Sequence, residues 1–188
     1  EWSAETSPGE WNTAGNIVFF GANSGPLRVR VKGGFAVTGF AIRPSGWHAM
    51  FSGPHSIWAD DMRPLQQLWG EIADEMISGV LKATDDEEQL HAMESCIRER
   101  LKLFPGVTPD TQMAQFEIIA RTDSTIRIED VAVRIGLSVR QLERRCLASF
   151  GLTPKAILRR SRFLDAAATL RGFSNPSEVE LGALRYYD

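Results

Sequence analysis

The segment that decides the fold of the C-terminal part is residues 128–147, Ile-Glu-Asp-Val-Ala-Val-Arg-Ile-Gly-Leu-Ser-Val-Arg-Gln-Leu-Glu-Arg-Arg-Cys-Leu. Ala132 is small where a second helix would cross a first one closely, and Gly136 permits the left-handed backbone of a tight turn. Ser138 is a favourable N-cap for the second helix, and Leu142 is spaced to pack inward beneath it. The segment therefore predicts two short helices joined at a glycine.

The outward face of the second predicted helix, over 138–150, carries two arginines and a glutamate. Arg140, Glu143 and Arg144 lie three or four residues apart, which places them together on the side opposite Leu142. Arginine binds guanine through paired hydrogen bonds, and glutamate accepts a hydrogen bond from the amino group of cytosine. One interpretation is that these charges are merely solvated. The other, which the surrounding charge favours, is that they read bases in double-stranded DNA.

The net charge differs between the two halves of the chain, although the whole chain carries only −3. Residues 1–108 contain 9 Lys and Arg against 14 Asp and Glu, whereas residues 109–188 contain 12 against 10. Within 134–162, eight basic residues accompany a single acid, Glu143. Such a basic stripe is typical of a surface for phosphates, which position a protein on DNA without specifying the sequence. The residues predicted to contact phosphates are Ser138, Arg145, Lys155 and Arg159.

The segments that follow carry a resemblance to a known family. Thr153 is a favourable N-cap and Pro154 suits the first position of a further helix, over 154–171. The matching segments are Ser138-x-Arg-x-Leu-Glu-Arg, Phe150-Gly-Leu-Thr-Pro-Lys, Arg162-Phe-Leu-Asp-Ala-Ala and Leu170. Together they resemble the first half of the DNA-binding domain of the AraC/XylS family of bacterial transcription regulators. The resemblance implies two helix-turn-helix units joined by one long helix, with both recognition helices in successive major grooves.

Ser177–Asp188 resembles the first helix and turn of the second unit of that family. We therefore expect the DNA-binding domain to be truncated within its second helix-turn-helix. The first residue is not Met, so we also expect that the start of the chain has been trimmed. Cys146 departs from the family, which usually has a large apolar residue there, and a buried cysteine is expected to pack in its place.

The N-terminal region is predicted to form a small antiparallel β unit, of the half-barrel or cupin-like kind. Apolar and basic residues alternate over 27–32, Gly33-Gly34 supplies a tight hairpin, and Phe35–Ile42 returns as a second strand. Asn16–Ala22 is a candidate for another strand. Thr38–Trp47 resembles the N-terminal part of some AraC-family regulators, which implies a domain that senses a small molecule or mediates dimerisation.

Two amphipathic helices are predicted after the β unit, followed by a break at 105–109 that contains two prolines. Their apolar positions are Leu65, Leu68, Ile72, Met76 and Val80 in the first, and Leu90, Met93, Ile97, Leu101 and Phe104 in the second. We expect an α+β protein with a sensing or dimerisation domain over 1–104, a linker over 105–108 and an all-α helix-turn-helix domain over 109–188. Homodimer formation through the two apolar stripes is an open alternative to packing within the domain.

We expect no metal site, no cofactor and no catalytic activity. His48 and His55 share a loop, but neither a His-x-His motif nor a supporting Glu at close spacing accompanies them. Cys96 lies among apolar helical positions, where an inert thiol is expected. The three histidines, which include His91, do not combine into a nucleophile, base and acid.

The remaining expectations concern location and partners. No apolar run approaches the roughly 20 residues that a bilayer requires, and the first residues lack a secretion signal, so we expect a cytoplasmic protein. The partners expected are double-stranded DNA and a small-molecule effector, for which the aromatic residues Trp47, Phe51, Trp58 and Trp69 are candidate pocket residues. The competing function is a cupin-like small-molecule or metal-binding protein whose helical tail mediates protein association.

Overall fold

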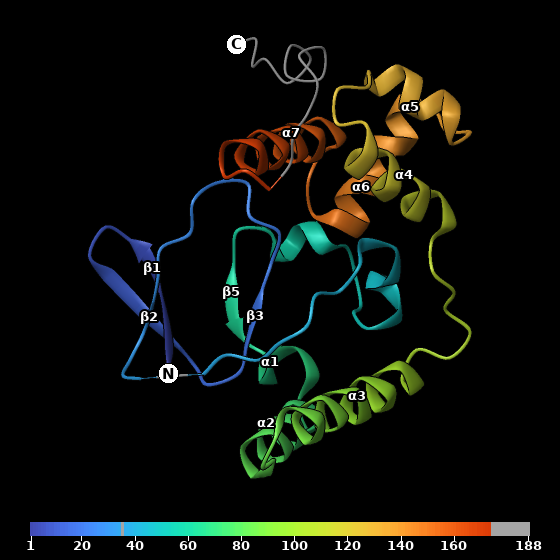
Figure 1. Ribbon diagram of the computed structural model, residues 1–188. Coiled ribbons are helices and arrows are strands. Elements are labelled where there is room, and N and C mark those ends of the chain that lie inside the picture. The colour runs from blue at the N-terminus through green and yellow to red at the C-terminus, as the bar shows by residue number, and fades with distance from the viewer. Residues whose placement is uncertain (35, 174–188) are drawn as a thin grey trace.

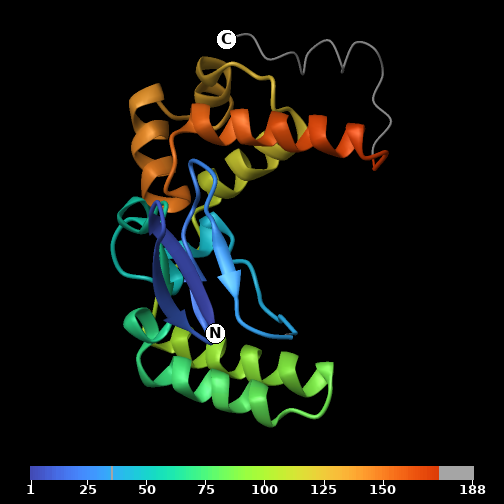
Figure 2. The ribbon, with the colours of Figure 1, turned by 90° about the vertical axis from the view of Figure 1, so that its left-hand side faces the viewer.

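A computed structural model describes residues 1–34 and 36–173, which form a mixed α+β protein with small antiparallel sheets (Figure 1). The strands lie between two groups of helices, with α2 and α3 at one end of the molecule and α4 to α7 at the other (Figures 1 and 2). None of the helices in the described ranges is long and apolar enough to cross a membrane.

The strands form two small antiparallel sheets. Their bounds are β1 Trp2–Ser7, β2 Glu10–Gly15, β3 Val18–Phe20, β4 Val29–Val31 and β5 Met62–Pro64. The first sheet has the order β2-β1-β4, and Trp2 of β1 lies opposite Val31 of β4. The second sheet pairs β3 with β5, with Val18 opposite Pro64. The sequence predicts strands at β3 and β4 but not at β1, β2 or β5.

The predicted hairpin around Gly33-Gly34 is wrong. Gly33 has the positive φ of +83° that a tight turn requires, but residues 36–42 form no strand. The edge of β4 is paired with β1 instead, which is far from it in sequence. Residues 36–41 of this segment are exposed, with Val37 61% and Phe40 40% accessible. Alternation in sequence indicated an extended chain but not its partner, because the partner is set by non-local packing.

Two short 3₁₀ segments lie between β4 and β5, and three helices follow β5. Their bounds are η1 Pro44–Ala49, η2 His55–Trp58, α1 Gln66–Trp69, α2 Glu71–Lys82 and α3 Asp86–Lys102. The first predicted helix is interrupted at Gly70, whose φ of +58° separates α1 from α2. The second corresponds to α3, and the two long helices pack as an antiparallel pair (Figure 2). Asp85 caps α3 by accepting a hydrogen bond from the backbone N–H of Glu88.

Four helices form the C-terminal part. They are α4 Thr111–Thr122, α5 Ile128–Arg134, α6 Val139–Phe150 and α7 Pro154–Leu170. Sequence analysis gave α5, α6 and α7 nearly as they are observed, but not α4. Thr153 caps α7 by accepting a hydrogen bond from the N–H of Ala156, as its position before Pro154 predicted.

Buried apolar side chains form two clusters. The N-terminal cluster is built around Trp47, Trp69 and Met76 and contains Cys96. The C-terminal cluster lies among α4 to α7 and contains Cys146. The segments η1 and η2 connect the two parts, since both pack against α6 and η1 also packs against α4.

Candidate nucleic-acid interface

The turn between α5 and α6 sets the angle at which α6 leaves the C-terminal cluster. Gly136 has a φ of +72°, and the N–H of Leu137 donates to the carbonyl of Ala132 over 2.8 Å. Ala132 is buried at the contact between the helices, and Leu142 is fully buried beneath α6. Ala132 and Leu142 are therefore buried and Gly136 has a left-handed backbone, and their roles in a helix-turn-helix stay a prediction.

Ser138 fixes the N-terminus of α6 through a reciprocal pair of hydrogen bonds. Its Oγ accepts from the N–H of Gln141 over 3.2 Å, and its own N–H donates to Oε1 of Gln141 over 2.8 Å. This capping box satisfies two backbone donors that a helix start otherwise leaves unpaired. The predicted N-cap is observed, and the remaining free N–H groups keep the positive end of the helix available to an anion.

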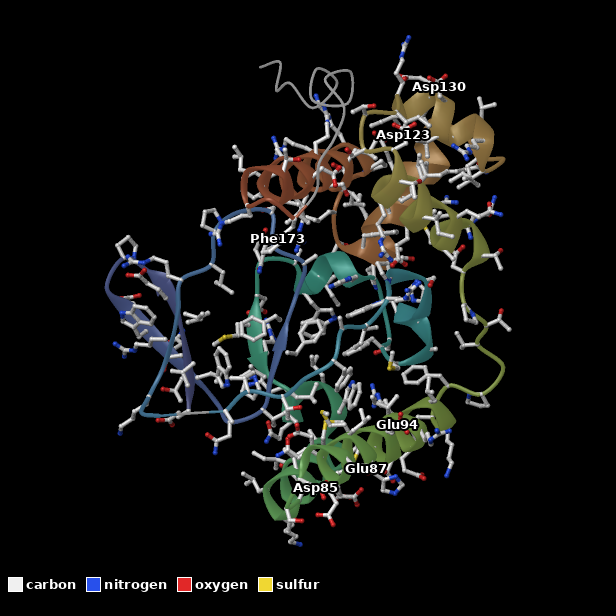
Figure 3. All side chains as sticks on the ribbon, in the orientation of Figure 1. Asp85, Glu87, Glu94, Asp123, Asp130 and Phe173 are labelled. Carbon is white, nitrogen blue, oxygen red and sulfur yellow. The ribbon has the colours of Figure 1, made fainter. Side chains whose placement is uncertain are left out.

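The two faces of α6 differ sharply in burial and charge. Leu142 and Cys146 are completely buried, whereas Arg140, Glu143 and Arg144 are exposed. Within residues 1–34 and 36–173, no acidic side chain pairs with Arg140 or Arg144. The acidic side chains Asp85, Glu87 and Glu94 lie by α3 at the opposite end of the molecule, whereas Asp123 and Asp130 lie by α4 and α5 (Figure 3). The outward face of α6 thus presents two guanidinium groups without a salt bridge among the described residues, together with the carboxylate of Glu143.

Arg145 has different surroundings from the neighbouring Arg144, and an internal ion pair competes with its predicted phosphate contact. Its guanidinium donates to both carboxylate oxygens of Asp110, over 2.6 Å and 3.1 Å, and also to the side chain of Gln112. A paired Arg–carboxylate contact of this kind is a strong charge-assisted interaction. Three of its five N–H donors bond inside the protein, so Arg145 ties the middle of α6 to the start of α4.

Asp110 is the acceptor in this pair and also the N-cap of α4. Its Oδ1 accepts from the N–H groups of Gln112 and Met113, both over 3.1 Å. Burial acts to raise the pKa of its carboxyl group, but the hydrogen bonds from Arg145 and the two backbone donors outweigh burial and lower the pKa. Asp110 therefore stays ionised next to Arg145.

Sequence reasoning missed Asp110, although a local signal was present. An Asp that follows Pro109 and precedes the buried Met113 and Phe116 is a typical helix N-cap. That signal predicts α4, but it does not identify Arg145 as the partner, since the two residues are 35 positions apart.

The other predicted phosphate contacts have mixed surroundings. Lys155 is exposed in the first turn of α7. Arg159 is exposed but makes an interaction within the chain. The Oγ of Ser138 serves the helix cap, which leaves its hydroxyl hydrogen for a phosphate oxygen. The predicted second unit at 177–188 lies outside the described residues.

His55 lies at the contact between the two parts of the molecule. Its ring stacks on that of Trp47 with centroids 4.0 Å apart, and Trp47 stacks on Phe51 on its other side. The Nδ1 atom is 3.2 Å from the carbonyl oxygen of Ser149, in the last turn of α6. Burial lowers the pKa of the imidazole, while the hydrogen bond to Ser149 acts in the opposite direction. His48, by contrast, is exposed.

No model of a known protein family matches the chain, and no curated protein or solved structure shows significant similarity to it.

Proposed function

We propose that the chain is a sequence-specific DNA-binding transcription regulator of the AraC type, in which α5 and α6 act as a helix-turn-helix and α6 enters the major groove. The observation that carries this proposal is the contrast between the two faces of α6. Its inner face is anchored at Leu142 and Cys146, and its outer face carries Arg140 and Arg144 without acidic partners among the described residues.

The spacing of the two arginines suits bases about two steps apart. Residues four apart on a helix are separated by about 6 Å along its axis, which corresponds to roughly two base steps of about 3.4 Å. Glu143 lies between them and is positioned to accept from a cytosine amino group. Arg140, Glu143 and Arg144 are therefore the proposed base-reading set.

Phosphate contacts are assigned to the start of α6 and the start of α7. The uncapped N–H groups of α6 and the hydroxyl of Ser138 are suitable donors, and Lys155 supplies a positive charge. Arg159 ranks below Lys155 as a residue for phosphate contact, because it already interacts within the chain. Arg145 is excluded because Asp110 binds it.

The first test is selection of preferred duplexes from a random pool, followed by fluorescence anisotropy at two salt concentrations. We expect one sequence class to be enriched and its affinity to fall as salt rises, because phosphate contacts release counterions. The double variant Arg140→Ala/Arg144→Ala should lose the preference for that class.

Arg98→Ala is the matched control for this test, since Arg98 is an exposed arginine on α3 that pairs with the exposed Glu94. It should leave both the affinity and the preference unchanged. Failure to enrich any sequence at low salt, or equal loss from the control, would contradict the proposal.

A further inference from the structure

A large cavity lies between the two groups of helices, away from the outward face of α6. Its volume is about 1110 Å³, which is slightly above the roughly 300–1,000 Å³ typical of small-molecule sites. Helices α2 and α3 bound one end and α4 and α7 bound the other, with the strands and residues 36–42 between them (Figure 2). Both hydrophobic clusters contribute to its walls.

The end formed by α1, α2 and α3 is apolar. The side chains that line it are Trp69, Met76, Ile77, Val80, Leu81 and Met93. Leu81 is 74% exposed, and Val37 and Phe40 add further exposed apolar surface from the neighbouring segment. Exposed apolar side chains that gather at the rim of a concave, apolar site indicate a binding surface.

The end formed by α4 and α7 carries charged side chains beside apolar ones such as Ile157 and Leu164. Glu117 and Arg121 of α4 and Arg160 of α7 line it. Glu117 is only partly exposed and lies 4.0 Å from Arg43 outside the cavity lining. In the part of the chain that the structure describes, Arg121 and Arg160 have no acidic partner, so positive charge is in excess at this end.

We propose that this cavity binds a small amphipathic anion, whose acidic group lies at Arg121 and Arg160 and whose apolar body lies against α2 and α3. The polarity of the two ends, which lie apart in both views, sets the orientation of the ligand (Figures 1 and 2). Arginine suits the acidic end because its planar guanidinium binds carboxylates through two parallel hydrogen bonds.

The test compares two probes that share one alkyl chain and carry opposite charges, dodecanoate and dodecyltrimethylammonium. Isothermal titration calorimetry of the full chain, below the concentration at which either probe forms micelles, should show saturable binding of dodecanoate and no binding of the cation. Equal binding of the two probes, or no binding of dodecanoate, would overturn the proposal.

Variants at each end of the cavity localise the binding. Arg121→Gln and Arg160→Gln should each weaken dodecanoate binding about tenfold, because each removes one charge-assisted contact. Leu81→Glu should weaken it as well, and because this position is exposed the fold is retained. Arg98→Gln removes the same charge from α3 outside the cavity and should have no effect. Unchanged affinity in both arginine variants would refute the site.

Sedimentation equilibrium distinguishes a ligand from a second copy of the chain. The proposal expects dodecanoate to bind without a change of mass, whereas a dimer that excludes dodecanoate would assign the cavity to self-association. Dodecanoate binding is measured without DNA, so the two proposals are tested separately. If the chain binds DNA but not dodecanoate, only the proposed ligand of the cavity is refuted. A chain that binds dodecanoate but no DNA removes only the proposed function.

Discussion

Arg144 and Arg145 are neighbours in sequence with opposite surroundings. The side chain of Arg145 is 32% exposed and held by Asp110, whereas Arg144 is exposed and has no acidic partner among the described residues. The basic stripe in the sequence predicts a contact with DNA for both residues. The distinction between them depends on a carboxylate 35 positions away, so it was not predictable from local sequence.

The two arginines should therefore respond differently to truncation. Arg144→Ala should relax base preference by about 1–3 kcal/mol at one position of the selected duplex, because one bidentate base contact is lost. Arg145→Ala should instead lower the free energy of unfolding. Competition binding against single-base duplex variants, together with urea unfolding, separates the two effects. Unaltered preference in Arg144→Ala would remove that residue from the base-reading set.

Two substitutions separate the capping role of Asp110 from the role of its charge. Asp110→Ala removes both and should lower the free energy of unfolding by about 1–3 kcal/mol, whereas Asp110→Asn keeps a good N-cap and should cost less. The pKa of Asp110 is lowered in the folded protein, so its ionic contribution is fully present above the unfolded value near 3.9. That contribution is lost as pH falls through the lowered pKa.

In urea unfolding at about pH 7, wild type should therefore have a higher free energy of unfolding than Asp110→Asn. This difference should disappear as pH falls below about 4. Glu94→Ala, which removes an exposed ion pair on α3, is the control and should change stability by no more than about 0.5 kcal/mol. A difference in the free energy of unfolding that does not change with pH would contradict the ionic role of Asp110.

At the scale of the element, the α5–α6 turn depends on the backbone of one residue. A Cβ at Gly136 would have no atom within 4 Å, so any cost of Gly136→Ala comes from its φ of +72° rather than from collision. We expect a loss of about 1 kcal/mol in Gly136→Ala and a smaller loss in Gly136→Asn, since Asn tolerates this conformation better.

Gly34→Ala is the matched control, because Gly34 also has open space around its Cβ but no left-handed φ. Thermal or urea unfolding measures the three variants. Equal cost at Gly34 and Gly136 would show that the left-handed backbone is not what makes glycine necessary in the turn.

Elements that depend on local signals were predictable, and those that depend on distant partners were not. Ser138 and Thr153 act within three residues of themselves, so the starts of α6 and α7 could be read from the sequence. Strand β4 pairs with β1 near the chain start, and nothing in residues 27–42 specifies that partner. The cavity is less predictable still, because its walls come from distant parts of the chain.

At the scale of the whole molecule, His55 joins the two parts through its contact with Ser149. Burial lowers the pKa of His55 in the folded protein below the unfolded value near 6.5. At a pH between these two pKa values, the unfolded chain binds a proton at His55 and the folded chain does not. The contribution of the neutral His55 side chain to the free energy of unfolding is therefore present above about pH 6.5 and is lost as pH falls.

We expect His55→Gln to reduce the loss of stability between about pH 7.5 and pH 5.5, since glutamine does not titrate. His91→Gln, on the exposed side of α3, should retain the wild-type dependence on pH. Urea unfolding at a series of pH values gives the comparison, and identical slopes for His55→Gln and wild type would contradict the prediction.

The two hydrophobic clusters contain one free, buried cysteine each, Cys96 in the first and Cys146 in the second. Burial raises the pKa of both thiols, so neither reacts readily while its cluster stays closed. The rate at which each cysteine is alkylated in native buffer therefore reports how often its own cluster opens. Equal rates would mean that the molecule opens as one cooperative unit, and unequal rates would rank the two clusters by their local opening free energies.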